Sequence, residues 1–267
     1  MTIVEPGKSL GLIKRKHSSA TGTAFTTHYS DTGDQQPDHL ESWHAHPDMH
    51  FCLFMQGGNT ELRKDKKVSV TPGHLAFYHA FEPHANCNAA FPSHNLILEI
   101  NTAFLKNNSV SELDFFNAFH RNPDEVKLEM LKICKELSIS DAASANAVEM
   151  LIMGMLHRDT VKKMPAWLER AKQVLNDRWS ETVSLAELSA VCNAHPVTIS
   201  KYFPKYFSVT LGQYQRRLKV ARSVALVKRK ALPLGEIAFE CGFADQNHFI
   251  RVFKSETGFL PNELRRF

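Results

Sequence analysis

The organisation of this chain is clearest in the stretch Ala238-Phe-Glu-Cys-Gly-Phe-Ala-Asp-Gln-Asn-His-Phe-Ile-Arg-Val-Phe-Lys254. Its first apolar positions have helical spacing and end at Gly242, a residue suited to the left-handed conformation that closes many helices. Asp245 can cap a second helix whose apolar positions face inward. Two short helices joined by a glycine-containing turn are typical of a helix-turn-helix. The exposed residues of the second helix are predicted to be Gln246, Asn247, Arg251 and Lys254.

A second helix-turn-helix is predicted upstream of the first. Ser184 and Glu187 have the spacing of a capping box, and Pro196 suits the first position of the next helix. We expect Pro204 to end that next helix near residue 203 or to kink it, because proline cannot donate a backbone hydrogen bond. Its outward residues are predicted to be Val197, Thr198, Ser200 and Lys201. A helix over residues 211–228, roughly 27 Å long, can hold the two motifs near the ~34 Å spacing of successive major grooves.

Charge is distributed unevenly along the 267 residues. Residues 165–267 hold 16 Lys and Arg against 9 Asp and Glu, whereas residues 1–164 hold 16 against 19. A basic C-terminal part is what a polyanion-binding domain needs, so we expect double-stranded DNA as its partner.

The C-terminal pattern resembles a known family. The spacing from Ala238 through Gly242 and Asp245 to Pro261 closely resembles the C-terminal motif of the AraC/XylS family of bacterial transcription regulators, and the resemblance covers about residues 167–266. It implies a sequence-specific, DNA-binding transcription regulator, usually an activator that recruits RNA polymerase and responds to a small-molecule effector. By position in the motifs, the outward residues on the second helix of each helix-turn-helix would contact one of two successive major grooves.

Residues 1–100 are predicted to form β-structure. Short apolar segments at residues 51–55, 68–71, 75–78 and 95–100 are separated by turn residues, including a Gly-Gly pair at Gln56–Asn59. Many short strands with such turns suggest a sandwich or barrel. The order His44-x-His46, a strand, a Gly-Gly turn, a Pro-Gly turn and Pro83-His84 resembles the cupin jelly roll. We therefore expect an α+β protein, with a cupin-like β-sandwich or jelly roll followed by an all-α domain with two helix-turn-helix motifs.

The histidines of this region allow two interpretations. His44 and His46 point to one face of a strand, and the resemblance places His50 and His84 near them, with Tyr78 as a further pocket residue. In metal-binding cupins two histidines, a glutamate and a later histidine hold one ion, and His50 stands about where that glutamate would be. The four histidines either bind a divalent transition metal, with Cys87 as a nearby soft ligand, or line a pocket for an organic effector.

The region between the two domains is predicted to be helical. Apolar residues recur at helical spacing between residues 101 and 156, and related regulators pair two subunits through helices in this position. The alternative is that these helices only cover the β-domain. We expect an effector domain at residues 1–100, a helical dimerisation segment and linker at 101–164, and a DNA-binding domain at 165–267. The linker is the Lys-rich stretch that begins at His157 and ends at Pro165.

Bulk properties exclude several protein classes. No apolar run approaches the ~20 residues of a membrane span, and five scattered cysteines favour a reduced, cytoplasmic protein. A metal-dependent cupin enzyme with a DNA-binding tail is a remote alternative. The sequence offers no further acid–base constellation for turnover, so we expect no enzyme activity.

Overall fold

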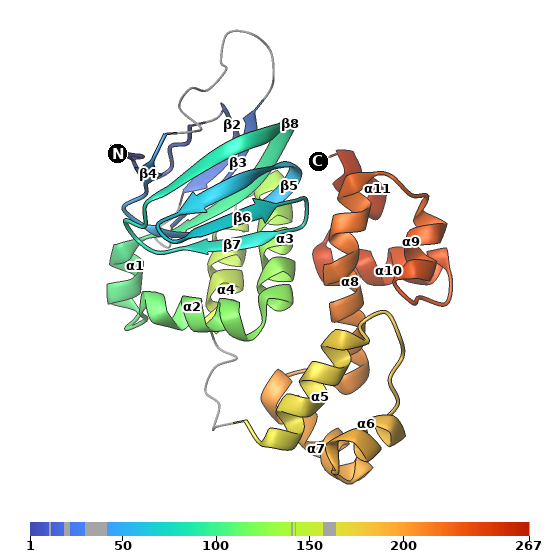
Figure 1. Ribbon diagram of the computed structural model, residues 1–267. Coiled ribbons are helices and arrows are strands. Elements are labelled where there is room, and N and C mark those ends of the chain that lie inside the picture. The colour runs from blue at the N-terminus through green and yellow to red at the C-terminus, as the bar shows by residue number, and fades with distance from the viewer. Residues whose placement is uncertain are drawn as a thin grey trace. The chain divides into compact units, whose positions relative to one another are not determined.

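The structure is a computed structural model that describes residues 1–10, 12–18, 22–29, 42–139, 141, 143–156 and 164–266. The chain divides into two compact units, Met1–Ile152 and Met153–Phe267. The first combines a sheet with helices and the second is helical, which confirms the α+β class (Figure 1). Most of the expected linker, residues 157–163, lies outside the described residues.

The sheet of the first unit is built around its two longest strands. The strands are β1 (Thr2–Ile3), β2 (Leu12–Ser18), β3 (Gly22–Tyr29), β4 (His44–Ala45), β5 (Met49–Arg63), β6 (Lys66–Val70), β7 (Leu75–Tyr78) and β8 (His84–Ile100). β8 lies antiparallel between β3 and β5, and β5 also pairs with β6 and β7. Figure 1 shows the resulting curled sheet. That the curl is a cupin jelly roll stays a prediction.

The Gly-Gly turn expected at residues 56–59 is wrong. These residues continue strand β5, and its register against β8 shifts repeatedly between Phe54 and Thr60. A β-bulge explains why two glycines are needed there. Gly57 has a φ of 78°, and a Cβ on it would lie 2.3 Å from the carbonyl oxygen of Ala90. The glycines therefore bend a long strand rather than end it.

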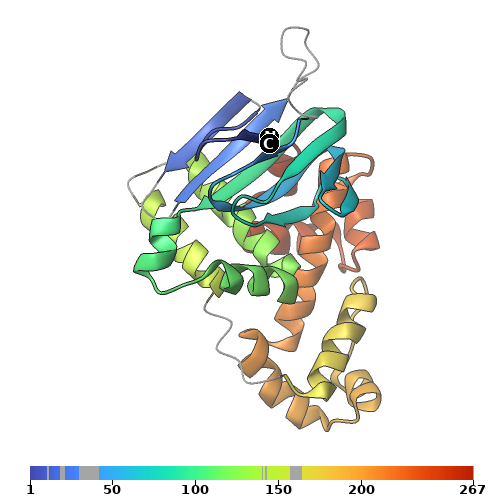
Figure 2. The ribbon, with the colours of Figure 1, turned by 60° about the vertical axis from the view of Figure 1, so that its left-hand side comes forward.

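After the sheet, the described residues form the helices α1 (Thr102–Asn107), α2 (Glu112–Arg121), α3 (Pro123–Ile139) and α4 (Ser144–Leu156). α3 packs on β2, β3 and β8 (Figure 2). Alternation along β8 separates its two faces, since Leu96 and Leu98 are fully buried while Asn95 and Ile97 line a cavity. The helices thus cover one face of the sheet and leave the other for a pocket.

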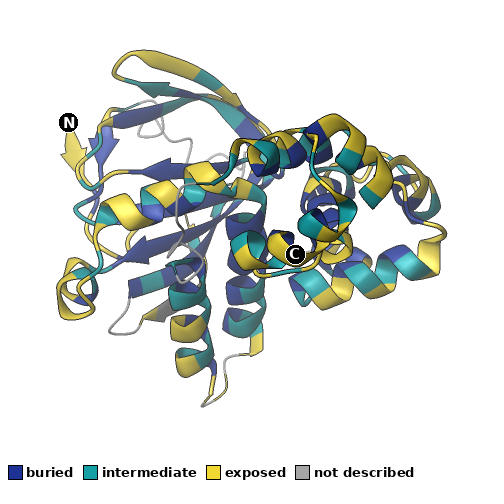
Figure 3. Cartoon of the chain, turned by 90° about the horizontal axis from the view of Figure 1, so that it is seen from below, coloured by how far each residue is buried: buried dark blue, intermediate teal, exposed yellow. Residues whose placement is uncertain are grey.

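The second unit is formed by α5 (Ala166–Asp177), α6 (Leu185–Cys192), α7 (Pro196–Phe207), α8 (Leu211–Arg229), α9 (Leu234–Glu240), α10 (Gln246–Thr257) and α11 (Pro261–Arg266). Buried and exposed residues alternate around these helices (Figure 3). Among the described residues, no helix is both long and apolar enough to cross a membrane.

Side-chain caps mark where α6 and α10 begin. Ser184 and Glu187 form the expected capping box of α6, and Asp245 accepts a hydrogen bond from the backbone N–H of His248 at 2.7 Å at the start of α10. The expected early end of α7 is wrong, because the helix continues through Pro204 to Phe207. Pro204 removes only one backbone hydrogen bond, the one to the carbonyl of Ser200, one turn before the helix ends. The buried side chain of Phe203 keeps this last helical turn in place.

Candidate ligand pocket and DNA-binding face

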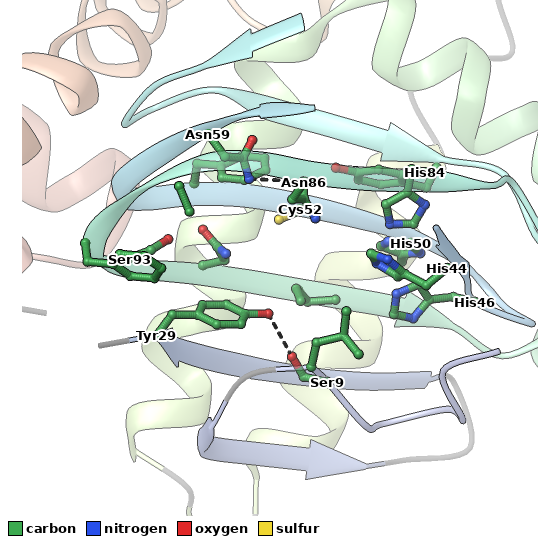
Figure 4. A pocket seen from close by; sticks show the side chains of 17 residues that line it. Ser9, Tyr29, His44, His46, His50, Cys52, Asn59, His84, Asn86 and Ser93 are labelled. Carbon is green, nitrogen blue, oxygen red and sulfur yellow. Dashed lines mark hydrogen bonds between the residues drawn. The ribbon is translucent and has the colours of Figure 1, made fainter. Parts of the chain in front are cut away.

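The main candidate site is a cavity on the side of the sheet opposite α3. The space between its walls, with the open solvent at its mouth included, is about 630 Å³. The four predicted histidines gather at one end, and Tyr29, Asn59 and Ser93 lie at the other (Figure 4). Tyr78 also lines this cavity, so the structure brings all five predicted pocket residues together.

Three of the four histidines come within reach of one ion. His44, His46 and His84 are buried, and one ring nitrogen of each lies within 4.8 Å of the others. The backbone explains this proximity, because His44 on β4 pairs directly with His84 on β8. The ring of His50 lies 4.4 Å from that of His46, but His50 is not part of this three-nitrogen cluster. Cys87 does not line the cavity and its thiol faces the carbonyl of Thr60 at 3.3 Å, so its expected place beside the histidines is wrong.

The second nitrogen of each clustered histidine faces an acceptor. Nδ1 of His44 lies 3.1 Å from the carbonyl of Ser42, and Nδ1 of His84 lies 3.0 Å from the carbonyl of Glu82. A carbonyl can only accept, so both Nδ1 atoms carry the hydrogen and each Nε2 keeps a lone pair. Nδ1 of His46 lies 3.4 Å from a carboxylate oxygen of Glu99, but neither atom has a hydrogen-bond partner among the described residues. Such partners orient histidines in metal sites, and they also orient histidines that bind an organic ligand.

Burial lowers the pKa of His44, His50 and His84, which keeps these three histidines uncharged at neutral pH. It lowers the pKa of His84 to about 3 and also lowers the pKa of His44. Burial also places the pKa of His50 well below the usual value. Neutral imidazoles can each donate and accept a hydrogen bond, or give a lone pair to a metal.

A buried network supports the histidine end from behind. The Tyr78 hydroxyl donates to the carboxylate of Glu61, which also accepts from the guanidinium of Arg63. Arg63 further donates to Glu82 at 3.0 Å, and Tyr78 stacks on His50 at 4.4 Å. The sequence interpretation missed Glu61, Arg63 and Glu99. Alternation along β8 could have placed Glu99 on the same face as Asn95, but the partners of Glu61 depend on the curl of the sheet.

The predicted DNA-binding residues lie on α7 and α10. On α7, Val197 is 64% exposed and Ser200 and Lys201 are also exposed, whereas Thr198 is half-buried. On α10, all four predicted residues are exposed: Gln246, Asn247, Arg251 and Lys254. Each helix buries phenylalanines on its opposite side, such as Phe203 and Phe249, so its polar face is fixed outward. That these residues contact DNA stays a prediction.

Comparisons with known proteins find a domain family, a transcriptional activator and solved structures to which this chain is similar. Residues 188–266 match the family described as "Helix-turn-helix domain". The HTH-type transcriptional activator RhaR of Escherichia coli (strain K12) is 22% identical over 257 residues, covering 87% of this chain and 89% of that protein. Among solved structures, the chain is similar to ToxT from Vibrio cholerae (10% identity, 95% of this chain and 98% of that one, TM-score 0.38). It is also similar to the C-terminal domain of AraT, a response regulator from Geobacillus stearothermophilus (24% identity, 39% of this chain and 88% of that one, TM-score 0.37).

Proposed function

We propose that this chain is a DNA-binding transcription regulator of the AraC/XylS type and not an enzyme. It activates its target promoters in response to a small ligand held in the N-terminal pocket. The observation that carries this proposal is the pocket itself. Buried histidines and amide side chains line it, and it belongs to the first unit, whereas the helix-turn-helix motifs belong to the second. RhaR, similar over most of the chain, is a transcriptional activator.

The DNA-binding unit would read two successive major grooves. Lys201 on α7 and Arg251 on α10 would pair with guanine or phosphate, and Gln246 and Asn247 with adenine. Since α8 is 19 residues long, it would hold the two recognition helices apart as a rigid spacer. The domain boundaries that we propose lie near residues 100 and 165.

Two further partners, RNA polymerase and a second copy of this chain, are proposed from the type of regulator and from the surface of α4. A cytoplasmic activator of this type would contact RNA polymerase. It would act as a homodimer paired through the helices of residues 101–156, where Met150 on α4 is 74% exposed. Analytical ultracentrifugation of Met150→Glu tests the dimer, because a charge placed in the interface should shift the protein to monomers.

The central test separates ligand response from DNA binding. His84→Leu removes the Nε2 lone pair in the pocket and also the Nδ1–H that donates to the carbonyl of Glu82, so a promoter reporter should lose activation. Affinity for an operator, selected from random DNA with the wild-type protein, should stay within about twofold because the recognition helices are unchanged. His120→Ala, an exposed histidine at the end of α2, is the matched control and should keep both properties. Unchanged activation by His84→Leu would contradict the proposal.

A second candidate makes a divalent transition metal the signal. His44, His46 and His84 offer three convergent ring nitrogens with oriented partners, a donor set that suits Zn, Ni, Cu or Fe. A bound ion would supply positive charge and an open coordination position in the pocket. No metal is named in the relatives above, so this candidate depends on geometry alone.

Equilibrium dialysis with Zn, Fe and Ni tests the metal candidate. We expect one ion per chain in the wild-type protein and loss of that ion in His44→Ala and His84→Ala. Retained activation by a protein that binds no metal would remove this candidate and leave the organic ligand.

A further inference from the structure

A buried lysine of α8 lies between the two helix-turn-helix motifs. Lys219 is 5% exposed, and its ammonium group donates to the carbonyl of Gly242 at 2.7 Å and to the hydroxyl of Thr182 at 3.3 Å. Among the described residues, no carboxylate forms an ion pair with it, and burial lowers its pKa. Lysines are almost never buried without a charged partner, because neutral oxygens replace only part of the lost hydration. The position of this lysine therefore calls for an explanation.

The two oxygens that accept from Lys219 belong to different motifs. Gly242 is in the turn of the α9–α10 motif, whereas Thr182 belongs to residues 180–183, the segment that leads from α5 into the α6–α7 motif. The backbones of the two segments touch, since a Cβ on Gly242 would lie 1.6 Å from the carbonyl oxygen of Ser180. Lys219 thus bridges the turn of one motif and the entry to the other.

A second side chain of α8 holds the same segment. Gln215 is buried one helical turn before Lys219, and its amide forms two hydrogen bonds with the backbone of Val183. It accepts from the N–H and donates to the carbonyl, both at 2.9 Å. Because a side-chain amide has both a donor and an acceptor, it can satisfy both backbone groups of one residue. Residues 180–183 are therefore attached to α8 by Gln215 and to the α9–α10 turn by Lys219.

This bridge restrains a motion that α8 alone leaves open. The α7 helix of one motif and both helices of the other pack on α8, so the length of α8 sets the distance between α7 and α10. Packing along one helix still allows the two motifs to rotate about that helix relative to each other. The contact between Ser180 and Gly242 does not pass through α8, so it fixes this rotation. The angle between the two recognition helices then has one value.

We infer that Lys219 is a positioning residue for DNA recognition, which locks the α6–α7 and α9–α10 motifs in one orientation and so restricts the protein to operators with one spacing between half-sites. This inference rests on the proposed function, because it concerns how the DNA-binding unit reads its operator. One additional base pair moves a half-site by about 3.4 Å and turns it by about 35° around the DNA axis. Locked motifs cannot follow that change, whereas loosened motifs can.

The first experiment measures the orientation without DNA. Nitroxide labels are attached to cysteines placed at Val191 on α6 and Phe239 on α9, both exposed, in a Cys87→Ser background whose other cysteines are buried. The labelled full chain is mixed with excess unlabelled chain, so that double electron–electron resonance reports distances within one molecule. We expect Lys219→Met, which removes the ammonium at similar length, to widen the distance distribution by about 1–2 Å.

The matched control is Lys228→Met. Lys228 is also buried on α8, but its ammonium donates to the carbonyl of Leu264 in α11, further along the helix. This variant removes an equally buried ammonium and should leave the distribution as narrow as in the wild type. Gln215→Met is a second test variant that detaches residues 180–183 from α8. It should widen the distribution, and it decides the matter if Lys219→Met does not fold.

The second experiment measures the spacing preference on DNA. Binding of the full chain is compared between the operator selected with the wild-type protein and two versions with one base pair inserted or deleted between the half-sites. We expect the wild type to bind the altered operators about tenfold or more weakly, and Lys219→Met to bind them within about threefold of the original. Lys228→Met should keep the wild-type ratio.

These measurements separate a positioning role from a merely structural one. A loss of stability alone would weaken binding to all three operators equally, and an unchanged ratio in Lys219→Met would overturn the inference. A wild type without a spacing preference would overturn it too, as would a distribution that stays narrow in both test variants or widens equally in the control. The proposed function fails on different evidence, namely a wild-type chain that selects no operator or unchanged activation by His84→Leu.

Discussion

Tyr78 lies flat against His50, with ring centroids 4.4 Å apart and an angle of 7° between the planes. The hydroxyl of the same tyrosine donates to the buried Glu61, and the guanidinium of Arg63 lies 4.4 Å above its ring. One side chain thus connects the charged network behind the pocket to the histidines inside it. This arrangement holds His50 in place without a charged group entering the cavity.

Removing the Tyr78 hydroxyl tests that connection. Tyr78→Phe keeps the ring stack but leaves one oxygen of the buried Glu61 without its donor. We expect a loss of about 1–3 kcal/mol in the free energy of unfolding, measured by urea denaturation. Tyr202→Phe, at an exposed position on α7, should change that free energy by less than about 0.5 kcal/mol. Equal effects of the two substitutions would mean that the Glu61 contact does not stabilise the fold.

The bulge in β5 gives a second prediction with a built-in control. Gly57→Ala would place a Cβ 2.3 Å from a backbone oxygen, at a φ of 78°, and should destabilise the protein by about 1–3 kcal/mol. Gly154→Ala changes a glycine of α4 that has nothing within 4 Å of the added carbon. It should stabilise the helix by about 0.5–1 kcal/mol. Thermal or urea unfolding of both variants checks the opposite signs.

These positions show why the two units differed in predictability. The C-terminal helices could be predicted because local chemistry, such as the Ser184 cap and the Gly242 turn, determines them. Pro204 misled the prediction, since the rule that proline ends a helix says nothing of the packing of Phe203. In the first unit, alternation indicated which residues share a face. Alternation did not indicate that a Gly-Gly pair bends a continuing strand. The position of Asn59 and Asn86 at the far end of the histidine pocket therefore could not be predicted.

Glu187 gives a prediction about pH. Hydrogen bonds from the backbone and hydroxyl of Ser184, followed by the Arg178 contact, lower the pKa of this carboxyl to about 2 from a usual 4.5. A lowered pKa means that the carboxylate stabilises the fold above about pH 4.5 and stops doing so as pH falls towards 2. Glu187→Gln should therefore be less stable than the wild type at pH 7, and the difference should shrink below pH 4.5. Unfolding curves measured over that pH range check this, and a gap that widens in acid would contradict it.

Arg251 is the sharpest test of the DNA-binding face. It is exposed on α10 beside Asn247, whose side chain lies one helical turn before it. If Arg251 pairs with both acceptors of a guanine, Arg251→Ala should weaken binding to the selected operator by about 1–3 kcal/mol and relax the preference at one base pair. Binding to random DNA should change much less, because the lost contact reads a base rather than the backbone. Arg222→Ala on α8, outside both recognition helices, is the control and should not alter the base preference. Titrations of operator and random DNA at two salt concentrations distinguish the cases, since an equal loss on both DNAs with a shallower salt dependence would assign Arg251 to a phosphate instead.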